Sequence, residues 1–295
     1  MNNKLIPESE LILNDDGSIY HLNLKPEDIA TTIITVGDPD RVADVTQYFD
    51  TIEATVQKRE FKTQTGTYKG KRLTVISTGI GTDNIDIVFN ELDALVNIDL
   101  NTRTVKNNFT QLTFIRIGTS GAIQPDIEMD SFLVSEKAIG FDGLLHFYNN
   151  VGFSERGFAE AFVKHTQWNP DRATPYVVSA DTILLKLFSE EVFLKGITGT
   201  NTGFYGPQGR KLRLQLQDTQ LNEKLESFQY KNQKITNLEM ETSGIYGMAR
   251  LLGHRAVSLN AILANRTNGD FSKNPKDTID KLISKTLELL VHEKF

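Results

Sequence analysis

The sequence predicts an α/β protein with a central sheet that helices cover on both faces. Short β-branched apolar runs alternate with longer amphipathic stretches along the chain, which is the α/β pattern. The apolar runs contain few polar residues, as is typical of strands buried on both faces. No linker rich in Pro, Gly or Ser divides the 295 residues. We therefore expect one domain over residues 1–295, with an N-terminal extension of about the first twenty residues.

The predicted strands are short, and Gly, Asp or Ser residues bound them. They lie at residues 31–36, 73–77, 112–118, 132–135, 176–179 and 257–264. Amphipathic helices are predicted at residues 83–96, 179–188, 241–252 and 276–293. Two further segments look inserted, the polar segment 97–111 and the segment 149–173.

Composition excludes several classes of partner. The net charge is −6 and the basic residues are dispersed, so we expect no nucleic-acid partner. The chain has no cysteine, which excludes a disulfide framework and thiol chemistry and fits a reducing compartment. It has neither an apolar leader nor an apolar run of about eighteen residues, so we expect no membrane partner and a cytoplasmic location.

A phosphate site is predicted where the first strand meets its helix, at Gly37-Asp38-Pro39-Asp40-Arg41. Asp38 is suited to cap a helix and Pro39 to occupy its first position. Free N–H groups at such a helix start attract anions, and Arg41 adds a full charge. The alternative is an ordinary turn with a surface arginine.

Arg116 lies within an apolar strand, followed by Gly118-Thr119-Ser120-Gly121, which we expect to form a turn. A buried arginine needs a carboxylate or a phosphate as its partner. Both alternatives stay open: an anion held at the carboxyl end of the strand, or a structural salt bridge. Residues 77–81 (STGIG) form another glycine-rich turn between a strand and a helix.

Glu239-Met240-Glu241 precedes a predicted helix of small residues. Ionised carboxylates only accept hydrogen bonds, so they suit the vicinal hydroxyls of a sugar. The alternative is that these charges complement the helix dipole.

A loop at residues 204–210 combines an aromatic ring, an amide and an arginine. Phe204 can stack on a base, and Gln208 can both donate to and accept from a base edge, with Arg210 close by. The alternative is a solvated loop with an aromatic anchor.

Metal and covalent chemistry have little support in the sequence. His146 and His254 have no partners at metal-ligand spacing, so we predict no metal site. Neither a Gly-x-Ser-x-Gly motif nor a Walker P-loop is present.

The motifs GDPDRV, REF, STGIG, RIGTSGAIQP, FYGPQGR, NLEME and ANR follow one another in this order between residues 21 and 266. The string resembles that of the uridine phosphorylase branch of the nucleoside phosphorylase superfamily. The resemblance implies a single α/β domain with a mixed, partly barrel-like sheet. It also implies a pentosyltransferase that reversibly converts uridine and phosphate to uracil and ribose 1-phosphate in nucleotide salvage. No cofactor is implied, since inorganic phosphate is the co-substrate.

The resemblance also implies roles for individual residues. Phosphate would be bound by Gly37, Arg41, Arg116, Thr119 and, from a neighbouring subunit, Arg59. Ribose would be bound by Glu239, Met240, Glu241 and the neighbour's His21, with Tyr20 helping to close the pocket. The base would be read by Phe204, Gln208, Arg210 and Arg266. The implied catalytic residues are Arg116, Gln208, Arg210 and Glu241, in a homodimer that shares its active sites or in a trimer of such dimers.

Ala264-Asn265-Arg266 lacks the aspartate that purine-specific relatives place there, which favours a pyrimidine base. The alternatives are a purine nucleoside phosphorylase or hydrolytic nucleosidase on the same scaffold, or a non-catalytic nucleoside-binding protein. Relatives can hold a monovalent cation through residues like Glu60 and Ile80, but Asn84 replaces their usual serine, so we do not predict that ion.

Overall fold

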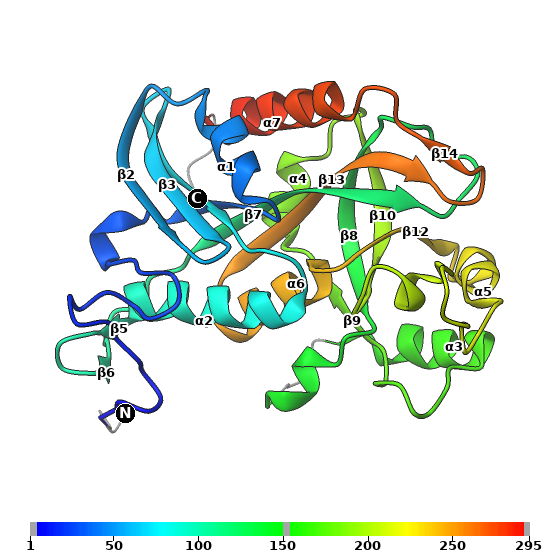
Figure 1. Ribbon diagram of the computed structural model, residues 1–295, viewed down its shortest axis with the longest axis horizontal. Coiled ribbons are helices and arrows are strands. Elements are labelled where there is room, and N and C mark those ends of the chain that lie inside the picture. Colours follow the sequence, from blue (N-terminus) through cyan, green and yellow to red (C-terminus); the bar gives the residue numbers. More distant parts are fainter. Residues whose placement is uncertain (1–4, 150–153, 292–295) are drawn as a thin grey trace.

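The computed structural model describes residues 5–149 and 154–291, which fold around a large mixed β-sheet flanked by helices (Figure 1). The strands of this sheet in the described residues are β1 (Thr32–Val36), β2 (Thr51–Lys58), β3 (Phe61–Tyr68), β4 (Lys71–Ser77), β7 (Thr113–Ala122), β8 (Phe132–Gly140), β9 (Tyr176–Ser179), β10 (Phe193–Thr200), β11 (Gln229–Tyr230), β12 (Gln233–Glu239), β13 (Arg255–Asn265) and β14 (Asp270–Phe271). Their order is β11-β12-β10-β8-β13-β7-β1-β4-β3-β2, with β9 beside β8 and β14 beside β13.

Part of the sheet closes on itself. β12, β10, β8, β13 and β7 are neighbours in that order, and an additional antiparallel pairing joins β12 to β7. From β7 the sheet continues as an open arm through β1, β4, β3 and β2. A closed ring with an open arm confirms the mixed, partly barrel-like sheet that the resemblance implied.

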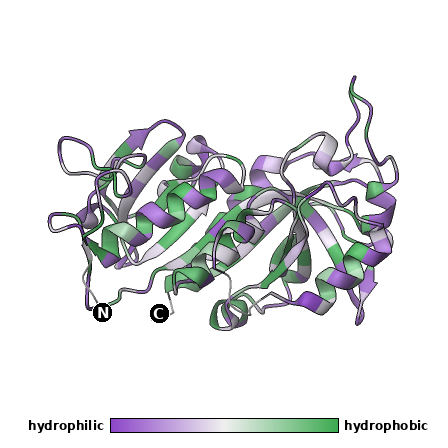
Figure 2. Ribbon diagram, turned by 90° about the horizontal axis from the view of Figure 1, so that it is seen from below, coloured by the Kyte–Doolittle hydropathy of each residue, from purple (hydrophilic) through white to green (hydrophobic). Residues whose placement is uncertain are grey.

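Helices cover both faces of the sheet. The helices are α1 (Pro39–Thr46), α2 (Thr82–Asn97), α3 (Arg156–Thr166), α4 (Thr182–Leu187), α5 (Leu221–Ser227), α6 (Thr242–Leu251) and α7 (Pro275–Val291), with short 3-10 turns η1 (Pro26–Asp28), η2 (Leu144–Phe147) and η3 (Gly206–Gln208). One apolar cluster joins α1, α4 and α7 to the sheet, and another joins α2 and α6 to it. Figure 1 places α7 and α2 on opposite sides, and Figure 2 shows hydrophobic residues concentrated on the strands between the helices. The expected two-sided cover is confirmed.

The predicted strands and helices are present, but some of them begin or end at other residues than predicted. The helix expected at 179–188 is shorter, because Asp181 caps it by accepting from Ile183 and Leu184 N. The last two residues of the helix expected at 276–293 lie outside the described residues. The turn expected at 118–121 is wrong: β7 continues to Ala122, because these residues pair with β13 and, at the end, with β12.

Several strands went unpredicted because their residues are polar. β2 is largely exposed, and the buried face of β3 includes Thr63 and Thr65. β10 and β12 were also missed. In β3 the buried positions alternate as they do in any strand, but threonines occupy two of them. Threonine suits a pleated strand, yet it lacks the apolar character by which the other strands were recognised.

The two segments that looked inserted have defined places. Segment 97–111 contains the hairpin β5 (Ile98–Asp99) and β6 (Thr104–Val105), and Arg103 beside it donates to the carbonyls of Ile6 and Leu11 in the N-terminal extension. Segment 149–173 contains α3, although its residues 150–153 lie outside the described part of the chain. Among the helices of that part, none combines the length and the apolar character that a membrane span requires.

Candidate active site

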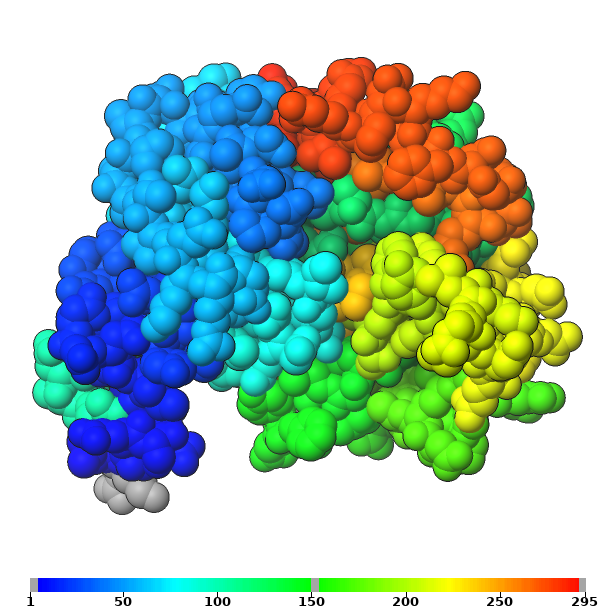
Figure 3. All heavy atoms as spheres, viewed as in Figure 1, coloured from blue at the N-terminus to red at the C-terminus, as the bar shows by residue number. Residues whose placement is uncertain are grey.

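A cavity of about 740 Å³ opens where the ends of β1, β4, β7, β12 and β13 meet the loop at 204–210. Figure 3 shows the hollow between the cyan, yellow-green and orange parts of the surface. Of the predicted site residues, those lining it are Gly37, Arg41, Arg116, Thr119, Phe204, Gln208, Arg210, Glu239, Met240 and Glu241. The structure thus brings together four motifs that are far apart in the sequence.

One wall of the cavity is the start of α1. Asp38 caps this helix by accepting from Asp40 N at 2.9 Å, and Pro39 occupies its first turn, as predicted. Burial and the nearby positive charge of Arg116 lower the pKa of Arg41. Two arginines whose charges repel one another face the same cavity, which favours an anion between them.

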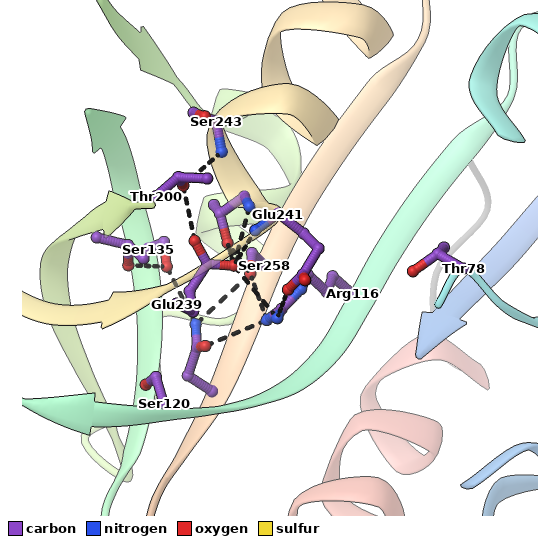
Figure 4. A network of polar contacts seen from close by, with 12 residues as sticks. Thr78, Arg116, Ser120, Ser135, Thr200, Glu239, Glu241, Ser243 and Ser258 are labelled. Carbon is purple, nitrogen blue, oxygen red and sulfur yellow. Dashed lines mark hydrogen bonds and ion pairs between the residues drawn. The ribbon is translucent and has the colours of Figure 1, made fainter. Parts of the chain in front are cut away.

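Arg116 on β7 forms a buried ion pair (Figure 4). Its Nη2 lies 2.7 Å from Glu241 Oε2 and 3.2 Å from Glu239 Oε2. Burial opposes its charge, but the two carboxylates outweigh this and raise the pKa of Arg116. The guanidinium folds over Gly118, where a Cβ would lie 1.9 Å from Nη1. Of the two alternatives for Arg116, the structural salt bridge is therefore present. Arg116 also lines the cavity, so the anion site stays a prediction.

Glu239 and Glu241 lie in different surroundings. Glu239 Oε2 accepts from the backbone N of Glu241 and Thr242 at 2.9 Å each and from the Thr242 hydroxyl, while its Oε1 accepts from Thr200. These bonds satisfy N–H groups at the start of α6, so the structural alternative holds for Glu239. A role for it in ribose binding stays a prediction.

Glu241 has fewer protein partners. Its Oε1 accepts from Gly81 N at 2.9 Å and its Oε2 from Arg116. Gly81 has a φ of 98°, a conformation that favours glycine, and this conformation presents its N–H to the carboxylate. Burial raises the pKa of Glu241, and the charge of Arg116 opposes the rise.

The base-side loop is held together by Arg210. Its guanidinium lies 3.8 Å from the Phe204 ring centroid and donates to Phe204 O at 2.7 Å and Gln208 Oε1 at 2.6 Å. Gln208 is buried whereas Phe204 is half exposed. The amide NH2 of Gln208 is therefore left for another acceptor, and the loop is ordered by its own side chains rather than being merely solvated.

Arg266 lies behind this loop and does not line the cavity. Its side chain packs on Gly121, where a Cβ would lie 3.4 Å from Arg266 Cδ. Burial and the charge of Arg210 lower the pKa of Arg266 to about 10. This placement fits an arginine that supports the loop, while its predicted part in binding the base stays a prediction.

His21, Arg59 and Tyr20 do not line the cavity of their own chain, although Glu60 beside Arg59 does. Arg59 is exposed at the turn between β2 and β3. Lys58 beside it donates to Tyr20 O at 2.6 Å, which ties this turn to the His21 segment. The His21 Nδ1 lies 2.5 Å from Glu91 Oε1. Their predicted role at a neighbouring subunit's site stays a prediction.

Sequence reasoning missed the contacts that hold the site residues in place, and it missed Asn260 and Glu91 altogether. Gly118 makes room for Arg116, Gly81 binds Glu241, Asn260 Oδ1 accepts from Arg116 at 3.2 Å, and Glu91 binds His21. Asn260, a polar residue inside the apolar run at 257–264, was the one local signal that could have been followed.

Comparisons with known proteins identify relatives of the chain. The family model described as "Phosphorylase superfamily" matches residues 31–292. A solved nucleoside phosphorylase of Trypanosoma brucei, described as showing uridine phosphorylase activity, is 30% identical with a TM-score of 0.86, over 96% of this chain and 100% of that one. The uridine phosphorylase of Thermococcus kodakarensis is 29% identical over 94% of this chain and 88% of that protein.

A purine enzyme is also similar. The DeoD-type 2 purine nucleoside phosphorylase of Vibrio cholerae is 26% identical over 92% of this chain and 98% of that protein. The family match covers most of the chain, as does the likeness to the solved trypanosomal structure. The chain therefore belongs to the phosphorylase superfamily.

Proposed function

We propose that the chain is a uridine phosphorylase, a pentosyltransferase that converts uridine and inorganic phosphate to uracil and ribose 1-phosphate. The observation that carries the proposal is a single cavity that joins two arginines, a buried carboxylate and a loop with an aromatic ring and an amide. Each part of a nucleoside and its attacking phosphate then has a group of matching chemistry. The relatives named uridine phosphorylase support the same substrate.

The phosphate would lie between Arg41 and Arg116, against the N–H groups at the start of α1 and the Thr119 hydroxyl. Both arginines face the cavity, and burial together with the charge of Arg116 lowers the pKa of Arg41, so a bound dianion would stabilise both cations. A hydrolytic nucleosidase would not need this pair of cations, which favours phosphorolysis over hydrolysis.

The ribose would lie over Glu241 and Met240. The Glu241 carboxylate accepts two hydrogen bonds from the protein, and its remaining lone pairs can accept the 2′- and 3′-hydroxyls. This places the sugar beside Arg116, whose Nη2 already contacts Glu241. Phosphate and sugar are thereby held next to one another, as attack on C1′ requires.

The base would stack on the exposed Phe204 ring, with the Gln208 amide and Arg210 at its polar edge. Ala264 lines the cavity, while Asn265 points away and donates to the carbonyls of Gln124 and Ile127. No acid is therefore present in segment 264–266 to protonate a purine nitrogen. This observation favours a pyrimidine, although a purine enzyme is among the relatives.

Bond cleavage would pass through an oxocarbenium-like transition state, with negative charge growing on the leaving uracil. Arg210 and the Gln208 NH2 would stabilise that charge, and the arginine-bound phosphate would be both nucleophile and counter-charge to the sugar. No cofactor or metal is needed for these steps. The reaction would be reversible, because ribose 1-phosphate keeps a high-energy anomeric bond and the same groups can bind substrates and products.

The functional unit would be a homodimer, because Arg59 and His21 do not line the cavity of their own chain. The contact between Lys58 and Tyr20 keeps both on one part of the surface, so one neighbour could supply both. Assembly of such dimers into a trimer, and work in cytoplasmic pyrimidine salvage, stay predictions.

Incubating purified protein with uridine, with and without inorganic phosphate, tests the proposal. We expect uracil and ribose 1-phosphate in equal amounts, and only when phosphate is present. Release of uracil and free ribose without phosphate would instead indicate a nucleosidase. Cleavage of inosine that matches or exceeds that of uridine would overturn the pyrimidine assignment, and absence of any cleavage would leave a nucleoside-binding protein.

A further inference from the structure

A fully buried asparagine lies behind the arginine of the phosphate site. Asn260 is on β13, where it is paired with Gly118 of β7 in parallel register, and Ser258 is likewise paired with Arg116. Gly118 has no Cβ, so the guanidinium of Arg116 can lie over it and reach the neighbouring strand. There Arg116 Nη1 donates to Asn260 Oδ1 at 3.2 Å.

The orientation of the Asn260 amide is fixed by a chain of buried side chains. Asn260 Nδ2 donates to Ser135 Oγ at 3.2 Å, and Ser135 Oγ lies 2.5 Å from Thr198 Oγ1. Thr198 donates to Asn237 Oδ1 at 3.0 Å, and Asn237 Nδ2 donates to the Ser120 hydroxyl at 2.9 Å. Because its NH2 is engaged on Ser135, Asn260 turns its oxygen toward Arg116.

Two carboxylates already share the other end of the same guanidinium. Glu241 and Glu239 both contact Nη2, and Figure 4 shows Arg116 pointing toward them. A third carboxylate at position 260 could make the same hydrogen bond, but it would add negative charge beside an anion site. A neutral amide oxygen holds Nη1 without that charge.

We propose that Asn260 is a positioning residue for phosphate: it holds Arg116 by a neutral acceptor, so that the guanidinium keeps its place and the site stays attractive to a dianion. This inference rests on the proposed function, because it assumes that Arg116 binds phosphate. Two features of Asn260 matter here: its acceptor oxygen and its lack of charge. A substitution can change each of them alone.

The variants are Asn260→Asp, which keeps the shape and adds a charge, and Asn260→Ala, which removes the acceptor. Asn97→Ala is the matched control, because Asn97 is also buried, donates to Asp93 Oδ1 and Thr110 O, and does not line the cavity. The apparent KM is measured separately for phosphate and uridine, and calorimetric titration with inorganic phosphate gives binding without the nucleoside.

For Asn260→Asp we expect the KM and Kd for phosphate to rise about 10- to 100-fold, with the KM for uridine changed by less than about threefold. Lowering the pH should relieve the defect, because protonation removes the added charge. Asn260→Ala should raise the phosphate constants without this pH relief. Asn97→Ala should lower the unfolding temperature and leave the phosphate constants within about twofold of wild type.

Wild-type phosphate constants in both Asn260 variants, or equal rises in the constants for phosphate and uridine, would overturn the inference. If Asn260→Ala fails to fold, the isosteric Asn260→Asp variant and its pH dependence still decide. The wild-type protein tests the proposed function separately. Phosphate-dependent uridine cleavage by wild type, together with unaltered phosphate binding in the variants, would refute only the role of Asn260.

Discussion

Under the proposed function Arg116 has two roles: it pairs with Glu239 and Glu241, and it binds phosphate. A single substitution removes both roles at once, and a second substitution separates their effects. In Arg116→Ala, Glu239 and Glu241 lose their shared cation while their side chains are only 2% and 8% exposed. Leaving buried charges unpaired costs about 3–5 kcal/mol of unfolding free energy. For a chain of 295 residues this corresponds to a fall of about 5–8 °C in the unfolding temperature.

Under the proposed function, the same substitution would also remove a charged hydrogen bond to phosphate. Such a bond contributes about 1.5–3 kcal/mol, which corresponds to roughly a 10- to 150-fold weaker affinity for phosphate. A loss of this size could also follow from local unfolding of the site. The double variant Arg116→Ala with Glu241→Gln distinguishes the causes, because a neutral glutamine needs no cation.

The assay compares thermal unfolding with calorimetric phosphate titration in wild type, both single variants and the double variant. We expect the double variant to regain a large part of the lost unfolding temperature and none of the lost phosphate affinity. Lys281→Ala is the control for removal of a positive charge, since Lys281 is 67% exposed and pairs with Asp277 outside the cavity. It should change unfolding by less than about 1 kcal/mol.

Wild-type phosphate affinity in Arg116→Ala would refute the anion role and leave Arg116 as a structural residue. Recovery of phosphate affinity in the double variant would show that the loss came from the unpaired carboxylates instead. An unchanged unfolding temperature in Arg116→Ala would refute the structural part of the reasoning.

Three further predictions follow from the site. Burial raises the pKa of Glu241 above its ordinary 4.5, and the protonated carboxyl cannot accept two hydroxyls, so kcat/KM for uridine should fall with falling pH through a midpoint above 4.5; the same fall in Glu241→Gln would contradict this. Gln208→Ala should slow uridine cleavage and reduce its preference over cytidine by about 1–3 kcal/mol, measured as a ratio of kcat/KM values, and an unchanged ratio would remove Gln208 from base reading. Arg59→Ala and Arg116→Ala proteins, each inactive alone, should regain activity when mixed under subunit exchange, whereas shared sites are ruled out if exchange is verified and activity does not return.

The sequence motifs located most of the residues that line the cavity, but they did not predict the whole sheet. The site residues lie in short motifs whose chemistry is local, such as the capped helix start at Asp38 and the amide beside an arginine in the loop at 204–210. The sheet depends on pairings over long separations. β2 and β3 were missed because their polar faces lack the apolar signal, and the closure between β12 and β7 joins residues more than a hundred positions apart.

The partner of Arg116 could not be predicted from the sequence for the same reason. A buried arginine in a strand indicated that an anion must be near, but its carboxylate lies 125 positions away in the sequence. Gly118 was expected in a turn, where glycine is common, and lies instead in a strand, where it makes room for a side chain two residues before it. Both facts follow from tertiary contacts that no local pattern encodes.

Under the proposed function, the charges around the cavity bear on whether a second subunit contributes to phosphate binding. Arg41 and Arg116 contribute two positive charges to the inner wall, while Glu239 and Glu241 contribute two negative charges, so these four residues sum to zero. A phosphate dianion bound there would compete with Glu239 and Glu241 for the positive charge of Arg116. Arg59, exposed at the tip of the turn between β2 and β3, is a cation that a neighbour could add. Under the proposed function, phosphate binding and dimer formation are therefore thermodynamically linked, since each would strengthen the other by the same free energy.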